Sequence, residues 1–160
     1  MTSRLAVPSN PRGLVYGTLL VATLLAAEPP RRETYARTVA AIVVAMIVYW
    51  LAASYAEFTG DRVLEEQPFT LESFGQTARR ELAVIYGGVG PLIAVLVCWA
   101  AGAQLTTAVT IAVWTAVAII VATEVAIGIR TELNCRQLFI QTGMGVVLGL
   151  MVVAVRVLLH

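Results

Sequence analysis

The sequence predicts an all-α integral membrane bundle of five transmembrane helices, with a short amphipathic cytosolic segment between the second and the third. Two observations predict it. Hydrophobic residues make up 59% of the 160 residues and charged residues only 13%, whereas about 25% of a soluble domain is charged. Several apolar runs also approach or exceed the ~20 residues that a helix needs to cross a membrane. In one domain, 1–160, we expect spans at approximately 13–28, 35–58, 82–103, 105–130 and 137–159, and a polar connector at 60–81.

The first apolar run, 13–28, is short for a span. About 15 residues at 1.5 Å per residue reach only roughly 23 Å. We interpret it as a retained span, and two alternatives stay open: a re-entrant helix, or the apolar part of a signal peptide. Gly13 and Gly17 form a G-x-x-x-G pattern, which predicts close packing against another helix. Pro29 ends the run, because proline cannot continue a helix.

The second run, 35–58, is uncharged from Thr38 to Ala56 and carries alanines at helical spacing. Small residues on one face favour contact with another helix. Tyr49 belongs either to an aromatic belt at the membrane surface or to an interior lining. Glu57 closes the run, and Gly60 is expected to be the C-terminal cap of this helix.

The connector, 60–81, is polar, and its charges nearly cancel. Thr70 followed by Ser73 predicts the start of a short helix after Pro68. The apolar residues of that helix share one face: Leu71, Phe74, Ala78 and Leu82. Three interpretations stay open: an amphipathic helix at the membrane surface, a solvated connector, and a surface that collects cations.

The third run, 82–103, contains the glycine-rich sequence YGGVGPL from Tyr86 to Leu92. Gly87, Gly88 and Pro91 weaken a helix and allow close approach of a backbone. They predict either a helix-packing face or a broken helix that exposes carbonyl oxygens to a cation.

The fourth run, 105–130, follows after a three-residue linker, so the two helices should form a tight hairpin. It is uncharged through Thr123 and then carries Glu124. A carboxylate at that depth costs about 2–3 kcal/mol or more if it faces lipid. We therefore expect Glu124 to face protein, water or an ion.

The last run, 137–159, carries Gln141 on the same face as Gly145, and Gly149 completes a second G-x-x-x-G packing pattern. Arg156, near its end, is expected to reach the membrane surface. Most arginines fall on the side of the N-terminus if five spans alternate, which predicts a cytoplasmic N-terminus.

On this topology several polar side chains fall at one depth. The candidates for an ion or proton pathway are Glu124, Glu57, Gln141, Tyr86 and Glu81. Two alternatives for Glu124 stay open: a structural hydrogen bond, for example to Gln141, and a pair with an arginine. The identity of any metal is unknown from this pattern, and the residues indicate no certain cofactor.

Other function classes lack support in the sequence. The only histidine is His160, and no Ser/His/Asp set, H-E-x-x-H motif or glycine-rich phosphate loop is present. We therefore predict no enzyme activity and no catalytic residues. A net charge of +1 gives no reason to expect binding of nucleic acid.

The order of these parts resembles the vacuolar iron transporter family of five-helix divalent-cation transporters. The closest similarity is Gly87-Gly88-Val89-Gly90-Pro91-Leu92, which looks like the G-G-x-x-P-L of that family's third span, and Gln141-Thr142-Gly143 is also similar. The resemblance implies the fold, a dimer and a divalent cation as ligand. The family has an aspartate in its first span and this chain has none, so the resemblance favours fold and dimerisation over iron transport.

Together these patterns predict a small multi-pass protein of a bacterial-type plasma membrane that transports a cation or protons, with Glu124 as its central group. The alternative is a non-transporting membrane subunit that binds a protein partner or lipid. The small-residue faces predict a homo-oligomer, with a homodimer as the first choice.

Overall fold

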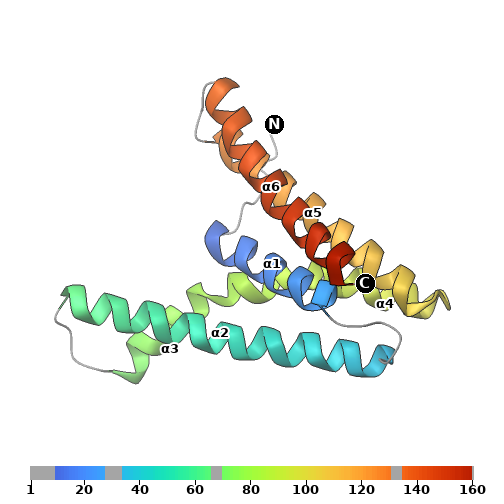
Figure 1. Cartoon of the computed structure of the whole chain (residues 1–160). Coiled ribbons are helices and arrows are strands. Elements are labelled where there is room, and N and C mark those ends of the chain that lie inside the picture. Colours follow the sequence, from blue (N-terminus) through green and yellow to red (C-terminus); the bar gives the residue numbers. More distant parts are fainter. Residues whose placement is uncertain (1–9, 28–33, 66–69, 131–134, 160) are drawn as a thin grey trace, which may run out of the picture.

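The computed structural model describes residues 10–27, 34–65, 70–130 and 135–159, and these residues form helices and no strand (Figure 1). The all-α class is confirmed, each expected span contains a helix, and the short helix α3 lies between the second and third spans. The helices are α1 (Pro11–Ala27), α2 (Tyr35–Glu65), α3 (Leu71–Arg80), α4 (Leu82–Ala100), α5 (Leu105–Arg130) and α6 (Cys135–Leu159).

Three helical stretches are long and apolar enough to cross a membrane. They are Tyr35–Arg62, Leu71–Ala100 and Leu105–Ile129. The helices Pro11–Ala27 and Thr142–Leu158 are apolar but shorter. Only 17 to 33% of the residues in the most apolar windows of the three long stretches are buried inside the chain, so most of their apolar surface faces outward. This is the character of a membrane protein.

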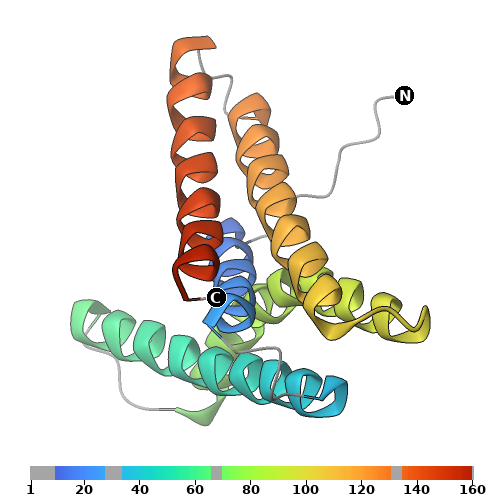
Figure 2. The same ribbon diagram turned by 45° about the vertical axis from the view of Figure 1, so that its right-hand side comes forward.

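The short helix α1 lies at the centre of the fold, in contact with α2, α4, α5 and α6. Helices α5 and α6 lie side by side and rise away from α2, which lies at a steep angle to them in both views (Figures 1 and 2). The helices therefore do not all run parallel as in a simple bundle.

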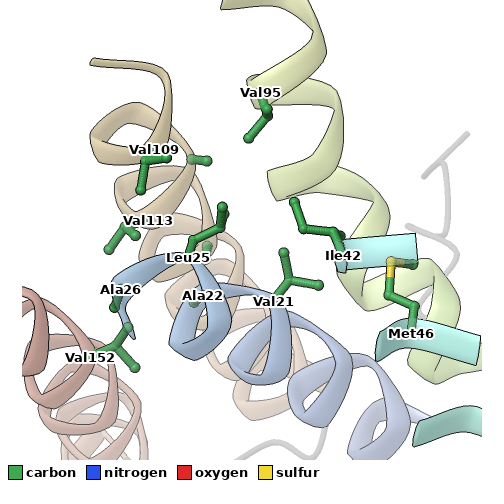
Figure 3. Close-up of a cluster of buried hydrophobic side chains, with 12 residues drawn as sticks. Val21, Ala22, Leu25, Ala26, Ile42, Met46, Val95, Val109, Val113 and Val152 are labelled. Atoms are coloured by element: carbon green, nitrogen blue, oxygen red, sulfur yellow. The ribbon is translucent and has the colours of Figure 1, made fainter. Parts of the chain in front are cut away.

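The core is built around α1, and five helices contribute to it (Figure 3). Val21 and Leu25 of α1 are fully buried. Around them lie Ile42 and Met46 of α2, Val95 of α4, Val109 and Val113 of α5, and Val152 of α6. Burial of a Val or Leu side chain contributes about 1.5–3 kcal/mol in water.

Helices α1 and α4 approach each other closely through glycines. A Cβ added to Gly17 would collide with the carbonyl group of Val84, and one added to Gly87 would collide with the carbonyl group of Leu14. At Gly13 an added Cβ would lie 3.0 Å from the Cβ of Ala83. The G-x-x-x-G of the first run therefore packs on α4, and side chains at these glycines would separate the two helices.

The remaining glycines of α4 face other helices. A Cβ added to Gly88 would lie 2.9 Å from Met46 of α2, and one added to Gly90 would collide with Ile119 of α5. Since Gly87 faces α1, three glycines within four residues give α4 close contacts on three sides. This accounts for the glycine-rich sequence without an ion site.

Helix α4 is continuous through Pro91, so the alternative of a broken helix is wrong. Proline has no N–H group and leaves the carbonyl four residues earlier, that of Gly87, without its helical partner. The hydroxyl of Thr18 on α1 replaces that partner, with 2.8 Å between Thr18 Oγ1 and Gly87 O. The same oxygen lies 2.9 Å from Leu14 O in its own helix. The proline therefore adds a link between two helices.

The expected end of the second helix is wrong, because α2 continues through Gly60 to Glu65. A glycine inside a helix costs only about 1 kcal/mol relative to alanine. Contacts in the turn after Gly60 offset this cost. Arg62 lies near the C-terminus of α2, where positive charge is favourable. The guanidinium of Arg62 lies 5.8 Å from the centre of the Phe58 ring.

The glycine with a positive φ among the described residues is Gly102, at 71°, and it ends α4. Its N–H donates to Trp99 O and the N–H of Ala103 donates to Cys98 O, both at 3.0 Å. This pair of bonds is a Schellman motif, which needs a left-handed residue at this position. The expected tight turn between the third and fourth runs is therefore present.

Helix α3 packs against α2. Thr70 caps its N-terminus by accepting the N–H of Ser73 at 3.3 Å, as the sequence predicts. The indole N–H of Trp50 on α2 donates to Ala78 O at 2.9 Å. Phe74 also packs edge to face on Phe58, with ring centroids 5.6 Å apart. The polar connector is therefore mostly helical and attached to the second span.

Helix α6 packs on α5 through Gly145 and Gly149. A Cβ on Gly149 would lie 2.8 Å from Val117 of α5. Arg156 does not simply extend to a membrane surface: it is half-buried, and its guanidinium donates to Leu25 O at 3.2 Å. That carbonyl belongs to the last turn of α1, where helix carbonyls lack partners and attract positive charge.

Candidate functional site

A polar cleft of about 680 Å³ opens where the first turn of α1, the second half of α2 and the start of α4 meet. These three helices bring residues far apart in the sequence to one place. Its polar and aromatic lining consists of Asn10, Arg12 and Tyr16, then Tyr49 and Glu57, then Arg80 and Glu81. Smaller residues, among them Ala53 and Ala56, form the rest of the α2 side.

Asn10 connects the start of α1 to a carboxylate of the cleft. Its Oδ1 accepts the N–H of Gly13 at 3.1 Å, which makes Asn10 the N-cap of α1. Its Nδ2 donates to Glu81 Oε1 at 2.8 Å. The order Asn10-Pro11 suits this place, because asparagine is favoured at the N-cap and proline at the first helical position.

Glu81 is half-buried and lies just before the apolar segment Leu82–Ala100. Burial raises the pKa of Glu81, and the nearby carboxylate of Glu57 raises it further. The hydrogen bond from Asn10 and the charge of Arg12 lower the pKa of Glu81, and both have smaller effects. The carboxylate at Glu81 is therefore under-compensated, which is an environment that favours a proton or a cation.

Two tyrosines line the cleft beside the carboxylates. Tyr49 is close enough to Glu81 and to Tyr16 for electrostatic interaction with both. Tyr49 is half-buried and Tyr16 is exposed. The sequence allowed two interpretations of Tyr49, as part of an aromatic belt or of an interior lining. In the structure Tyr49 lines the cleft.

Glu124 lines a second pocket, of about 320 Å³, that adjoins the first. Arg12 and Tyr16 line both pockets. Glu124 is half-buried, and a Cβ on Gly145 of α6 would lie 2.9 Å from its Cγ. The glycine of the second G-x-x-x-G therefore makes room for the carboxylate of α5.

The structure brings together some of the predicted pathway residues and separates others. Glu57 and Glu81 face one cleft, and Glu124 lies in the adjoining pocket. Tyr86 is 66% exposed, and it lines neither pocket. The side chain of Gln141 lies outside the described residues. Among those that are described, no three His, Cys, Asp or Glu side chains are grouped closely enough to hold a metal ion.

Sequence reasoning missed the α1 side of the cleft. Asn10 and Arg12 belong to a stretch that looks like a polar tail, and Arg80 is one charge among many in the connector. The dipeptide Asn10-Pro11 is a helix-start signal that places Asn10 at an N-cap. No local pattern, however, could have paired it with Glu81.

Comparison with protein-family models, with curated proteins and with solved structures finds no match to this chain. The resemblance to vacuolar iron transporters therefore stays a prediction. The geometry of the cleft is the basis for a functional proposal.

Proposed function

We propose that this chain is a membrane transporter or channel for a cation or protons, and that the polar cleft is the entrance to its pathway. The observation that supports this most is the pairing of Glu57 and Glu81, from different helices, in one cleft next to apolar helices. Carboxylates held near a membrane in this way are costly, and they commonly belong to ion or proton pathways.

The pathway continues from the cleft to Glu124. The two pockets share Arg12 and Tyr16, so a proton or ion that leaves Glu81 meets these side chains before it reaches Glu124. Glu124 belongs to the apolar helix α5. It therefore extends the series of carboxylates from the cleft into the protein.

Location and assembly follow from the same features. The arginine distribution supports a bacterial-type plasma membrane protein with a cytoplasmic N-terminus, and the cleft then opens to the cytoplasm. Exposed apolar side chains on α2 and α6, such as Val44 and Phe139, give surfaces for lipid and for a second copy of the chain. A homodimer is the first assembly to test.

Flux through proteoliposomes tests the proposal. Purified protein is reconstituted with an internal pH dye, and proton entry is driven by a potassium diffusion potential. Flux of sodium, divalent cations and benzyltrimethylammonium is assayed in parallel. Glu124→Gln and Glu81→Gln should each lower flux more than tenfold. Glu72→Gln, on the exposed surface of α3, is the matched control and should leave it unchanged. Equal flux in the wild type and the three variants would reject the proposal. Absence of flux above that of empty liposomes would also reject it.

The second candidate is a non-transporting membrane subunit. One observation favours it: α6 exposes apolar side chains along its length, from Phe139 at 81% to Leu158 at 84%. A helix that is apolar on most sides is covered by lipid or by another protein. Recovery of a stoichiometric protein partner from native membranes, together with no flux in liposomes, would favour this candidate over transport.

A further inference from the structure

The polar cleft has the size and lining of a small-molecule site. Its volume of about 680 Å³ falls within the ~300–1,000 Å³ typical of such sites. A single dehydrated metal ion would fill a small part of it. We propose that the ligand of this cleft is an organic cation, an ammonium group carried on an apolar body. This rests on the proposed function, because it names the class of cation.

The cleft offers two carboxylate side chains, Glu57 and Glu81, to a metal ion. Calcium takes six to eight oxygen ligands and magnesium demands an octahedron. The described residues hold no group of three suitable side chains. Both ends of the Asn10 amide already have partners, because its Oδ1 accepts the N–H of Gly13 and its Nδ2 donates to Glu81. A change in that orientation would remove the N-cap of α1.

The lining suits an organic cation instead. Tyr16 and Tyr49 present aromatic rings beside the two carboxylates, and aromatic faces attract ammonium groups. Ala53 and Ala56 leave room on the α2 wall for an apolar body. The cleft therefore combines carboxylates for the charge of such a ligand with aromatic rings and small apolar residues for its body.

The arginines of the cleft do not cancel this preference. Arg12, Arg80 and Glu57 are exposed, so solvent and salt screen their charges, whereas Glu81 is half-buried and its charge is screened less. At Glu81 the effect of Glu57 is larger than that of Arg12. A bound cation between Glu57 and Glu81 would relieve the repulsion of the two carboxylates.

Binding to the full chain in detergent tests the ligand class, independently of flux. The probe is benzyltrimethylammonium, titrated by isothermal calorimetry. Its uncharged isostere neopentylbenzene controls for partition into micelles, and magnesium and sodium chloride are titrated as rivals. We expect saturable binding of the ammonium probe alone. Glu81→Gln should weaken it about tenfold or more, and Glu57→Gln, at an exposed position, gives the same test without risk to the fold.

Separate variants test the contribution of the aromatic side chains of the cleft to binding. Tyr49→Leu should weaken binding about 3- to 10-fold, while Tyr49→Phe keeps the ring and should bind nearly as the wild type does. Tyr55→Leu is the matched control on α2, because Tyr55 is 66% exposed and lies outside the cleft.

The outcomes separate the two proposals. Binding of magnesium or sodium without binding of the ammonium probe overturns the organic-cation assignment and leaves cation transport standing. Equal binding of the ammonium probe and its uncharged isostere also overturns the assignment. Absence of binding by every cation to the folded protein, together with absence of flux, overturns both proposals.

Discussion

Replacement of Thr18 by valine tests whether the proline of α4 is stabilised from α1. Valine has nearly the same shape, so the change removes the hydroxyl and little else. Thr18 is 0% exposed, and Gly87 O would be left buried without the donor that now lies 2.8 Å away. A buried carbonyl without a partner costs about 1–3 kcal/mol, and hydrogen bonds between membrane helices average ~0.6 with a maximum near 1.7 kcal/mol. We therefore expect Thr18→Val to lower the free energy of unfolding by about 1–2 kcal/mol.

A second substitution makes the test specific. Pro91→Ala restores a backbone N–H that can bond Gly87 O within α4. In the double variant the loss of the Thr18 hydroxyl should then cost little, so the two changes should couple by about 1 kcal/mol in a double-mutant cycle. Reversible unfolding in mixed micelles by SDS titration, followed by circular dichroism, measures all four proteins.

The matched control is Thr115→Val. The hydroxyl of Thr115 donates to Ile111 O at 2.8 Å in its own helix, and that carbonyl also receives the helical N–H of residue 115. Its loss should change stability by less than about 0.5 kcal/mol. The reasoning is refuted if Thr18→Val is as stable as the wild type, or if its effect is the same with proline and with alanine at position 91.

Three further predictions follow from contacts described above. Gly17→Ala should destabilise the fold by more than about 2 kcal/mol, because the added Cβ would collide with the backbone of α4. Its control in the same SDS titration is Gly75→Ala, whose added Cβ would have no neighbour within 4 Å, and which should be neutral or stabilising by up to ~1 kcal/mol. Trp50→Phe removes the hydrogen bond to α3 and should speed trypsin cleavage of that helix several-fold, whereas an unchanged rate would show that this bond does not hold α3. The raised pKa of Glu81 means that Glu81 takes up a proton at a higher pH than the ~4.3 of ordinary glutamate. The affinity for benzyltrimethylammonium should therefore fall on acidification before that pH is reached, and Glu81→Gln should flatten this part of the pH profile.

The helices could be predicted from the sequence because their signals are local. Apolar runs, the Thr70 cap and the prolines each act within a few residues, and the structure has a helix at every predicted place. The end of α2 was missed for the same reason: Gly60 is a stop signal by local rules, but its cost inside a helix is small enough for the next turn to offset.

Partners between helices could not be predicted in the same way. The glycine pairs indicate that α1 and α4 have close-packing faces, but the pattern does not say that Gly17 meets Val84. Proline at position 91 predicts an unbonded carbonyl at Gly87, yet the donor comes from a residue 69 positions away in the sequence. The cleft depends on such pairings, so only its two carboxylates were among the residues predicted for the pathway.

The double role of Asn10 has a consequence for how this protein can change. One amide group starts the central helix and also orients the carboxylate of Glu81. Serine or aspartate would still begin the helix, but neither offers an N–H to Glu81, and aspartate would add a third negative charge. A substitution at this position therefore cannot change the start of α1 and leave the orientation of Glu81 untouched, since both depend on the side-chain amide group of Asn10.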